Sequence, residues 1–212
     1  MAKSNNWEFL LSVVFGEERT IKACARLAYR DIRRNLSGVG SMPPQDKQAW
    51  REEIEGLIDR CLEELSRNTS YQREAFDVWH KQTCEQIIEL SGKHGVPKEF
   101  TYGLAQKWLN MTIKNMLVME QWDWLVLFKD CLHVPVDSYI MEAAVALGIE
   151  LIDKKGQFQS YKAGVSKPWS QWDYSEYDKF QKKLREIVPC PMDWEFDAWR
   201  EVKAKRENKK SS

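Results

Sequence analysis

Helical spacing of apolar residues is the feature that most limits what this chain can fold into. Between residues 46 and 66, apolar side chains recur three or four positions apart on one face, while Arg and Glu fill the other face. No segment shows the alternating pattern of a half-buried strand. The sequence therefore predicts an all-α fold, a multi-helix globular domain. The same period predicts further helices over residues 7–36 (with a break near Gly16), 71–90, 102–119, 138–147, 175–187 and 194–205, and a short element at 122–128.

The domain organisation expected is a single all-helical unit over residues 1–205, which could comprise two helical subdomains with a cleft between them. With 212 residues, 43% of them hydrophobic and ten of them Trp, the chain can bury a large core. Residues 37–46 and 153–172 are predicted loops, the second with room for a short strand. The basic residues 206–212 are predicted to form a disordered tail.

The charge pattern excludes a partner recognised by bulk charge. The 32 basic residues balance 32 acidic ones, so no overall field attracts nucleic acid or a membrane surface, although a local patch would not alter this sum. No apolar run is long enough to span a bilayer, and the N-terminal residues lack the features of a signal peptide. We therefore expect a cytoplasmic protein without a membrane partner.

The cysteines and histidines give no sign of a metal site. The five Cys are scattered and form no C-x-x-C pair, which is typical of reduced core thiols. The three His lack metal-ligand spacing, and we expect each to be structural or exposed. Neither a metal nor another cofactor is predicted.

The segment "VPVDSYIMEAAVALGI" (residues 134–149) contains the carboxylate of greatest interest. Asp137 stands where the N-cap of a helix belongs, and Gly148 stands where that helix should stop. Capping alone is a sufficient explanation of this Asp. The alternative is that Asp137 also faces a basic residue from elsewhere in the chain.

The order of residues across this region resembles that of the helix-hairpin-helix DNA glycosylases, the superfamily of endonuclease III. In that family a Val-Asp precedes a helix, and a catalytic Lys lies upstream; here "YGLAQKWLNMTIKNML" offers Lys107 and Lys114. The spacing of thirty residues from Lys107 to Asp137, with a second Lys after seven, is closest to the archaeal 8-oxoguanine glycosylase branch. The resemblance covers about residues 98–150.

This resemblance implies a glycosylase-like helical fold and base excision from DNA as in DNA repair, with associated lyase activity. Lys107 would be the nucleophile that attacks the sugar C1′, and Asp137 would stabilise the cationic sugar and shuttle the proton. Such enzymes flip the nucleotide into a pocket, and no metal is needed. The substrate-binding residues expected under this hypothesis are Lys114, Trp108, Trp122 and Trp124.

The chain departs from the family pattern at the hairpin. The usual Leu-Pro-Gly-Val-Gly followed by Lys-Thr is missing, and Gly103 is the one glycine kept near Lys107. "LSGVGS" at 36–41 imitates the hairpin, but "MPP" follows where the Lys helix should begin, so we interpret it as a turn. The departure weakens the expectation of a backbone-phosphate contact at the family's position.

A second hypothesis is a non-enzymatic helical interaction or regulatory protein, for example phage- or defence-related, that binds a protein partner through aromatic surface. It treats Lys107 as a solvated helix residue and the Trp residues as core. The geometry separates the two hypotheses. A glycosylase requires Lys107 and Asp137 to face one cleft within a few ångströms of each other.

Overall fold

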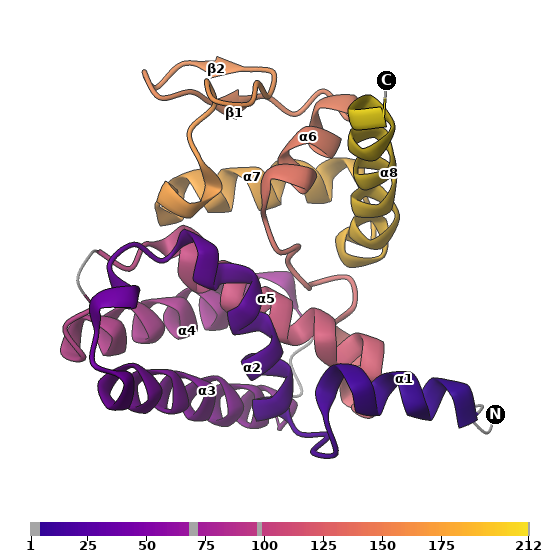
Figure 1. The fold of residues 1–212 in the computed structure, drawn as a ribbon. Helices are drawn as coiled ribbons and strands as arrows, with labels where there is room; N and C mark the ends of the chain where they lie inside the picture. Colours follow the sequence, from indigo (N-terminus) through magenta and orange to yellow (C-terminus); the bar gives the residue numbers. More distant parts are fainter. Residues whose placement is uncertain (1–4, 68–71, 97–98, 212) are drawn as a thin grey trace.

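A computed structural model describes residues 5–67, 72–96 and 99–211 of the chain, and this part is mostly helical (Figure 1). The elements are α1 (Asn5–Phe15), α2 (Ile21–Ile32), η1 (Arg33–Asn35), η2 (Val39–Ser41), α3 (Pro44–Ser66), α4 (Arg73–Lys93), α5 (Tyr102–Met119), η3 (Asp123–Phe128), α6 (Ser138–Ala146), β1 (Leu151–Ile152), β2 (Phe158–Gln159), η4 (Trp169–Gln171), α7 (Tyr174–Ile187) and α8 (Pro191–Ser211). The all-α class is confirmed. Within the described residues, no helix is long and apolar enough to cross a membrane.

Most predicted helices are present, and local sequence explains their ends. The break expected near Gly16 separates α1 from α2, because Gly16 has φ of 80° and Thr20 caps the next helix by accepting from the Ala23 N–H. The bounds predicted for residues 102–119 are those of α5, which Thr101 caps. The start predicted for the third helix at residue 71 lies outside the described residues, and so does residue 98, where the family resemblance begins.

The C-terminal segment differs from the prediction of a disordered tail, since α8 continues to Ser211. Tertiary contacts explain the difference. The Arg206 guanidinium donates to the Glu142 carboxylate and to Ser138, and it stacks over the Tyr139 ring at 4.1 Å. These contacts attach the last turns of α8 to the start of α6 and stabilise a helix that its composition alone would not.

The helices form two groups that meet at the middle of the molecule (Figure 1). Helices α2, α3 and α4 pack with α5 in one group, while α6, α7 and α8 lie in the other, together with the short antiparallel pair β1–β2. The short strand expected within residues 153–172 is β2, and its partner β1 lies directly before that predicted loop.

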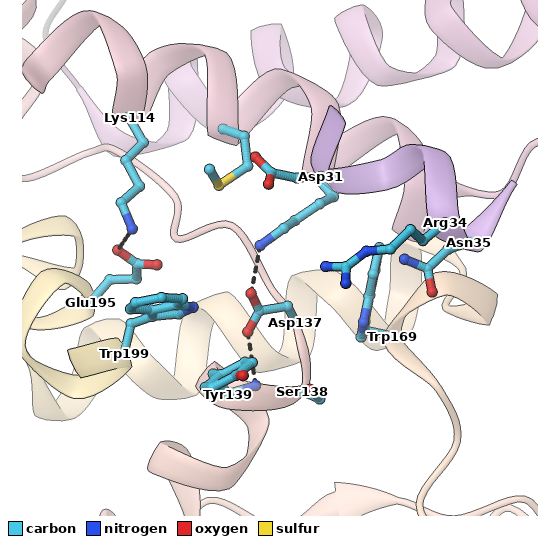
Figure 2. A pocket seen from close by; sticks show the side chains of 12 residues that line it. Asp31, Arg34, Asn35, Lys114, Asp137, Ser138, Tyr139, Trp169, Glu195 and Trp199 are labelled. Carbon is cyan, nitrogen blue, oxygen red and sulfur yellow. Dashed lines mark hydrogen bonds and ion pairs between the residues drawn. The ribbon is translucent and has the colours of Figure 1, made fainter. Parts of the chain in front are cut away.

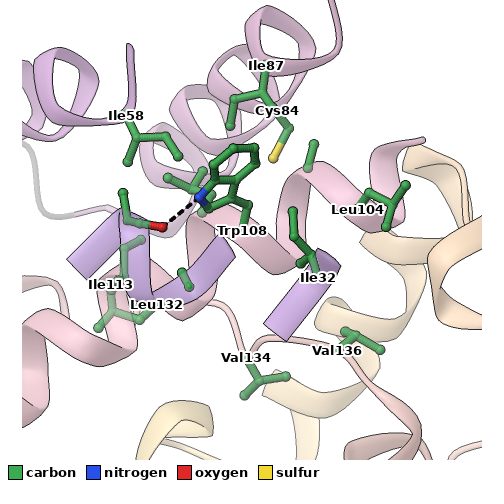
Figure 3. Packing of buried hydrophobic residues seen from close by; sticks show 14 of the residues in the cluster. Ile32, Ile58, Cys84, Ile87, Leu104, Trp108, Ile113, Leu132, Val134 and Val136 are labelled. Atoms are coloured by element: carbon green, nitrogen blue, oxygen red, sulfur yellow. Dashed lines mark hydrogen bonds between the residues drawn. The ribbon is translucent and has the colours of Figure 1, made fainter. Parts of the chain in front are cut away.

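The core is centred on α5, whose residues are buried along nearly the whole helix. Trp108 is fully buried, and its indole N–H donates to the Ala25 carbonyl of α2 at 2.9 Å (Figure 3). Its ring contacts those of Trp50 and Tyr29. One face of α5 packs against α2 and α4. Side chains on another face, such as those of Lys107 and Lys114, point into the space between the two groups of helices.

An extended segment, residues 132–136, joins the two groups and is buried, and no strand in the described part of the chain pairs with it. Glutamine side chains take the place of that partner. Gln181 accepts from the Val134 N–H and donates to the Val134 carbonyl. Gln106 makes the same pair of bonds with Val136. Buried backbone groups that water cannot reach are thereby satisfied.

Candidate functional site

A pocket of about 520 Å³ opens where the two groups of helices meet (Figure 2). A volume of this size is typical of small-molecule and nucleotide sites. Its lining comes from both groups: Asp31, Arg34, Asn35, Lys107, Met111, Lys114, Asp137, Ser138, Tyr139, Trp169, Glu195 and Trp199. Three cations and three carboxylates are among these residues, so the pocket is polar and close to neutral.

Lys107 and Asp137 form an ion pair in this pocket. Nζ of Lys107 lies 2.8 Å from Oδ2 of Asp137 and also donates to the Pro135 carbonyl at 3.4 Å. The lysine side chain is 5% exposed and the aspartate side chain 17%, so the pair is largely shielded yet reachable from the pocket. The proximity that the first hypothesis requires is present.

Asp137 also caps α6, with its other oxygen. Oδ1 accepts from the N–H groups of Tyr139 at 2.8 Å and Ile140 at 3.0 Å. Burial by itself raises the pKa of this carboxyl, but the Lys107 charge and hydrogen bond, together with the two backbone N–H groups, outweigh burial and lower the pKa below its usual value. Capping and pairing are therefore simultaneous, and Asp137 is held ionised in a fixed orientation.

A second ion pair, between Lys114 and Glu195, lies in the same pocket (Figure 2). Lys114 Nζ is 2.5 Å from Glu195 Oε2, at angles outside hydrogen-bond geometry, and Oε1 has no donor among the described residues. Burial of Glu195, which is 0% exposed, raises the pKa of its carboxyl despite the Lys114 charge. The Lys114 ammonium offsets part of the cost of burying this carboxylate, while Oε1 stays a buried acceptor without a donor among the described residues.

Aromatic rings form another wall of the pocket. Tyr139 and Trp199 contact each other with ring centroids 5.2 Å apart, and both face the cavity (Figure 2). Trp169 lines a different part of it and is 8% exposed. Gly103 positions this last ring, because its N–H donates to the Trp172 carbonyl and a Cβ there would lie 1.9 Å from the Trp169 carbonyl oxygen.

Asp31 and Arg34 line the side of the pocket that faces α2 and η1 (Figure 2). Burial raises the pKa of the Asp31 carboxyl, and the Asp137 charge acts in the same direction, while Lys107 and Lys114 oppose them. Arg34 is exposed and contributes a cation at the rim.

Of the predicted substrate-binding residues, Lys114 lines the pocket and the three Trp do not. Trp108 directly follows Lys107, so its side chain points about 100° away around the helix, into the core. Trp122 and Trp124 pack against the core beside η3. The expected stacking role does not fit the positions of these three rings.

Sequence reasoning missed the pocket residues supplied by other helices: Asp31, Arg34, Tyr139, Trp169, Glu195 and Trp199. Tyr139 stands two residues after the cap Asp137, and this place brings it to the pocket. Glu195 and Trp199 are one helical turn apart on α8, and this spacing puts them on one face. This spacing of four residues was the sequence signal that could have placed Glu195 and Trp199 side by side.

Comparisons of the chain with protein-family models, with curated proteins and with solved structures gave no match.

Proposed function

We propose that the protein is a DNA glycosylase with lyase activity, acting through Lys107 and Asp137. The observation that carries this proposal is the 2.8 Å contact between Nζ of Lys107 and Oδ2 of Asp137 inside a pocket of nucleotide size. A shielded Lys beside a fixed carboxylate is the pair needed for amine attack on a sugar carbon. The resemblance of residues 98–150 to the helix-hairpin-helix glycosylases assigns the same two residues.

The reaction begins with loss of a proton from Lys107, because only the neutral amine is a nucleophile. Oδ2 of Asp137 is in hydrogen-bond contact and accepts that proton once a bound nucleotide excludes water from the pair. The amine then forms a bond to C1′ as the bond from C1′ to the base breaks. The base departs with the bonding electrons and takes up the proton that Asp137 received from Lys107. Asp137 is then a carboxylate again and stabilises the positive charge on the sugar.

The steps that follow cleave the DNA strand and constitute the lyase activity. Opening of the sugar ring gives a Schiff base between Lys107 and C1′. Loss of the C2′ proton then expels the 3′ phosphate by β-elimination, and water releases the lysine. Each step uses proton transfer and covalent bonding to the amine, so the two residues supply the chemistry.

Base binding is assigned to the wall formed by Tyr139, Trp199 and Glu195. A flipped base stacks on aromatic faces and is recognised by hydrogen bonds to its polar edge. The unpartnered Oε1 of Glu195 is a buried acceptor at this wall, suited to an N–H group of a base. Lys114 holds the other oxygen of Glu195 and would thereby orient it.

The proposal is tested by borohydride trapping on a panel of duplex oligonucleotides, each with one damaged or modified base. Borohydride reduces the Schiff base and leaves a covalent protein–DNA adduct. We expect an adduct with at least one member of the panel, and no adduct for Lys107→Gln with that member. Wild-type protein that gives neither adduct nor base release on the whole panel would contradict the proposal.

A second candidate is the interaction protein, and the exposed apolar side of α1 favours it. Phe9 is 65% exposed and Val13 64%, with Leu10 and Val14 also exposed. Patches of this kind mark contacts with other proteins. This function predicts that Phe9→Glu abolishes partner capture, whereas adduct formation would be unchanged by it.

A further inference from the structure

A second concavity, of about 460 Å³, lies beside the pocket and is cationic. It is lined by Tyr29, Arg33, Arg34, Leu36, Val39, Gly40, Pro44, Lys47, Gln48 and Arg51. Four of these residues are basic, and no carboxylate is among the described residues that line it. We call this surface the basic groove. It runs between η1, the turn that contains η2, and the start of α3.

The charge of the basic groove is local, because the whole chain is neutral. Residues 26–51 contain six basic and two acidic residues. Within the described part of the chain, Arg33, Arg34 and Lys47 form no ion pair, whereas Arg51 pairs with the buried carboxylate of Glu55. Three of the four cations thus keep their charge available for an anion.

The basic groove adjoins the Lys107 pocket, since Arg34 lines both concavities. An extended anion that follows the groove would therefore pass the mouth of the pocket. The turn also leaves its backbone accessible: no atom lies within 4 Å of the place where a Cβ of Gly40 would stand. Basic side chains and open backbone therefore line the same concave surface.

We propose that the basic groove binds the phosphodiester backbone of duplex DNA on one side of the nucleotide that enters the pocket. This proposal rests on the proposed function and adds the surface that would hold the duplex. A row of cations along a concave surface, with Arg forks that match phosphate oxygens, is the arrangement that backbone contacts require. The predicted turn at residues 36–41, to which the glycosylase chemistry gives no role, forms part of this surface.

The test uses undamaged duplex DNA, so that it does not depend on catalysis. Binding of a fluorescent duplex is measured by anisotropy between 50 and 200 mM salt for wild type and for Arg33→Gln/Lys47→Gln. Each lost phosphate contact lowers the slope of log K against log[salt] by about 1, so the double variant should lose about 2. Gly40→Asp, which places a carboxylate in open space at a φ that side chains adopt, should also weaken binding.

The matched control is Lys179→Gln/Lys183→Gln, which removes two exposed cations from α7 near Phe158, outside both concavities. It should keep the wild-type affinity and slope. Thermal melting checks that each variant is folded. Arg33, Lys179 and Lys183 are exposed and Lys47 is partly buried, and none of the four forms an ion pair among the described residues, so Tm should stay nearly unchanged.

Three results would overturn the basic groove as a DNA site. The first is a wild-type protein that binds no duplex. The second is an unchanged affinity and slope in the Arg33→Gln/Lys47→Gln and Gly40→Asp proteins. The third comes from binding to phosphatidylserine vesicles: variants that lose vesicle binding but keep duplex binding would assign the groove to a membrane surface. Failure of the proposed function looks different: no trapped adduct, but groove-dependent binding of undamaged duplex.

Discussion

Gln106 holds the backbone of Val136 at both of its polar groups. Nε2 of Gln106 donates to the Val136 carbonyl at 3.2 Å, and Oε1 accepts from the Val136 N–H at 3.3 Å. Each residue stands directly before a member of the ion pair, Lys107 or Asp137. This clamp therefore explains how two side chains thirty residues apart in sequence are kept in contact.

Replacing Gln106 by Leu should damage the site more than the fold. The change leaves both polar groups of Val136 without partners, which we expect to cost about 1–3 kcal/mol of unfolding free energy. Displacing Asp137 by about 1 Å should lower the rate of adduct formation by roughly a hundredfold. Urea unfolding and single-turnover trapping, well below the Tm, measure the two effects.

Gln181→Leu is the matched control, because Gln181 clamps Val134 in the same way but two residues further from Asp137. Asn110 still donates to the Val134 carbonyl, so this change should cost less stability, and it should alter the rate of adduct formation far less. Adduct formation at the wild-type rate by the Gln106→Leu protein would show that the clamp is structural alone.

The Lys107–Asp137 pair should show strong energetic coupling. Asp137→Asn can still cap α6 but leaves the buried Lys107 charge without its partner, a change that costs about 3 kcal/mol. The double variant Lys107→Met/Asp137→Asn removes both charges and should recover most of that loss while remaining inactive. A double-mutant cycle by urea unfolding gives the coupling, and additive single effects would mean that the pair does not interact.

Gly103→Ala should be destabilising although Ala favours helices. Its Cβ would meet the Trp169 carbonyl oxygen at 1.9 Å, so η4 must move, at a cost of about 1–3 kcal/mol. Gly56→Ala in α3 is the control with the opposite sign. The only atom within 4 Å of its new Cβ is the end of the Arg60 side chain, at 3.5 Å. The substitution should therefore stabilise the protein by about 0.5–1 kcal/mol. Equal effects of both changes on Tm would contradict the close packing at Gly103.

Stability should fall as the pH drops below about 6.5, because of two buried histidines. Burial lowers the pKa of His80 well below 6.5, with the neighbouring His133 acting in the same direction, and burial also lowers the pKa of His133 itself. The unfolded chain then binds protons that the folded chain does not. The contribution of each such histidine to the free energy of unfolding is fully present above the pKa of the unfolded chain. As the pH falls below that value, the contribution is lost at about 1.4 kcal/mol per pH unit.

Urea unfolding at pH 7.5, 6.0 and 5.0 measures this loss. His94→Gln, at the histidine outside the core, is the matched control and should leave the loss of stability from His80 and His133 in place. A stability that is constant between pH 7.5 and 5.0 would mean that the buried histidines are protonated in the folded protein.

Much of the fold could be predicted from the sequence because helical period and caps are local signals. The bounds of α5 and the cap at Asp137 each depend on a few neighbouring residues, and both predictions are confirmed. The expected proximity of Lys107 to Asp137 came from the family resemblance rather than from any local pattern. No periodicity could have supplied it, since the clamps by Gln106 and Gln181 that create it depend on long-range contacts.

The aromatic wall could not be predicted for the same reason. A Trp beside the nucleophile in sequence, such as Trp108, points to another face of the helix and enters the core. Trp199 lies ninety-two residues from Lys107 and reaches the pocket because α8 packs on α6. The helical C-terminus was missed because the contacts of Arg206 with α6, and not its own composition, stabilise it.

The most direct test of Lys107 as the nucleophile is to locate the reduced adduct in the chain. Wild-type protein is trapped with borohydride on a reactive duplex, digested with nuclease and protease, and sequenced by mass spectrometry. We predict that the sugar remnant is on Nζ of Lys107. A remnant on Lys114, on the N-terminal amine or on any other residue would contradict this assignment.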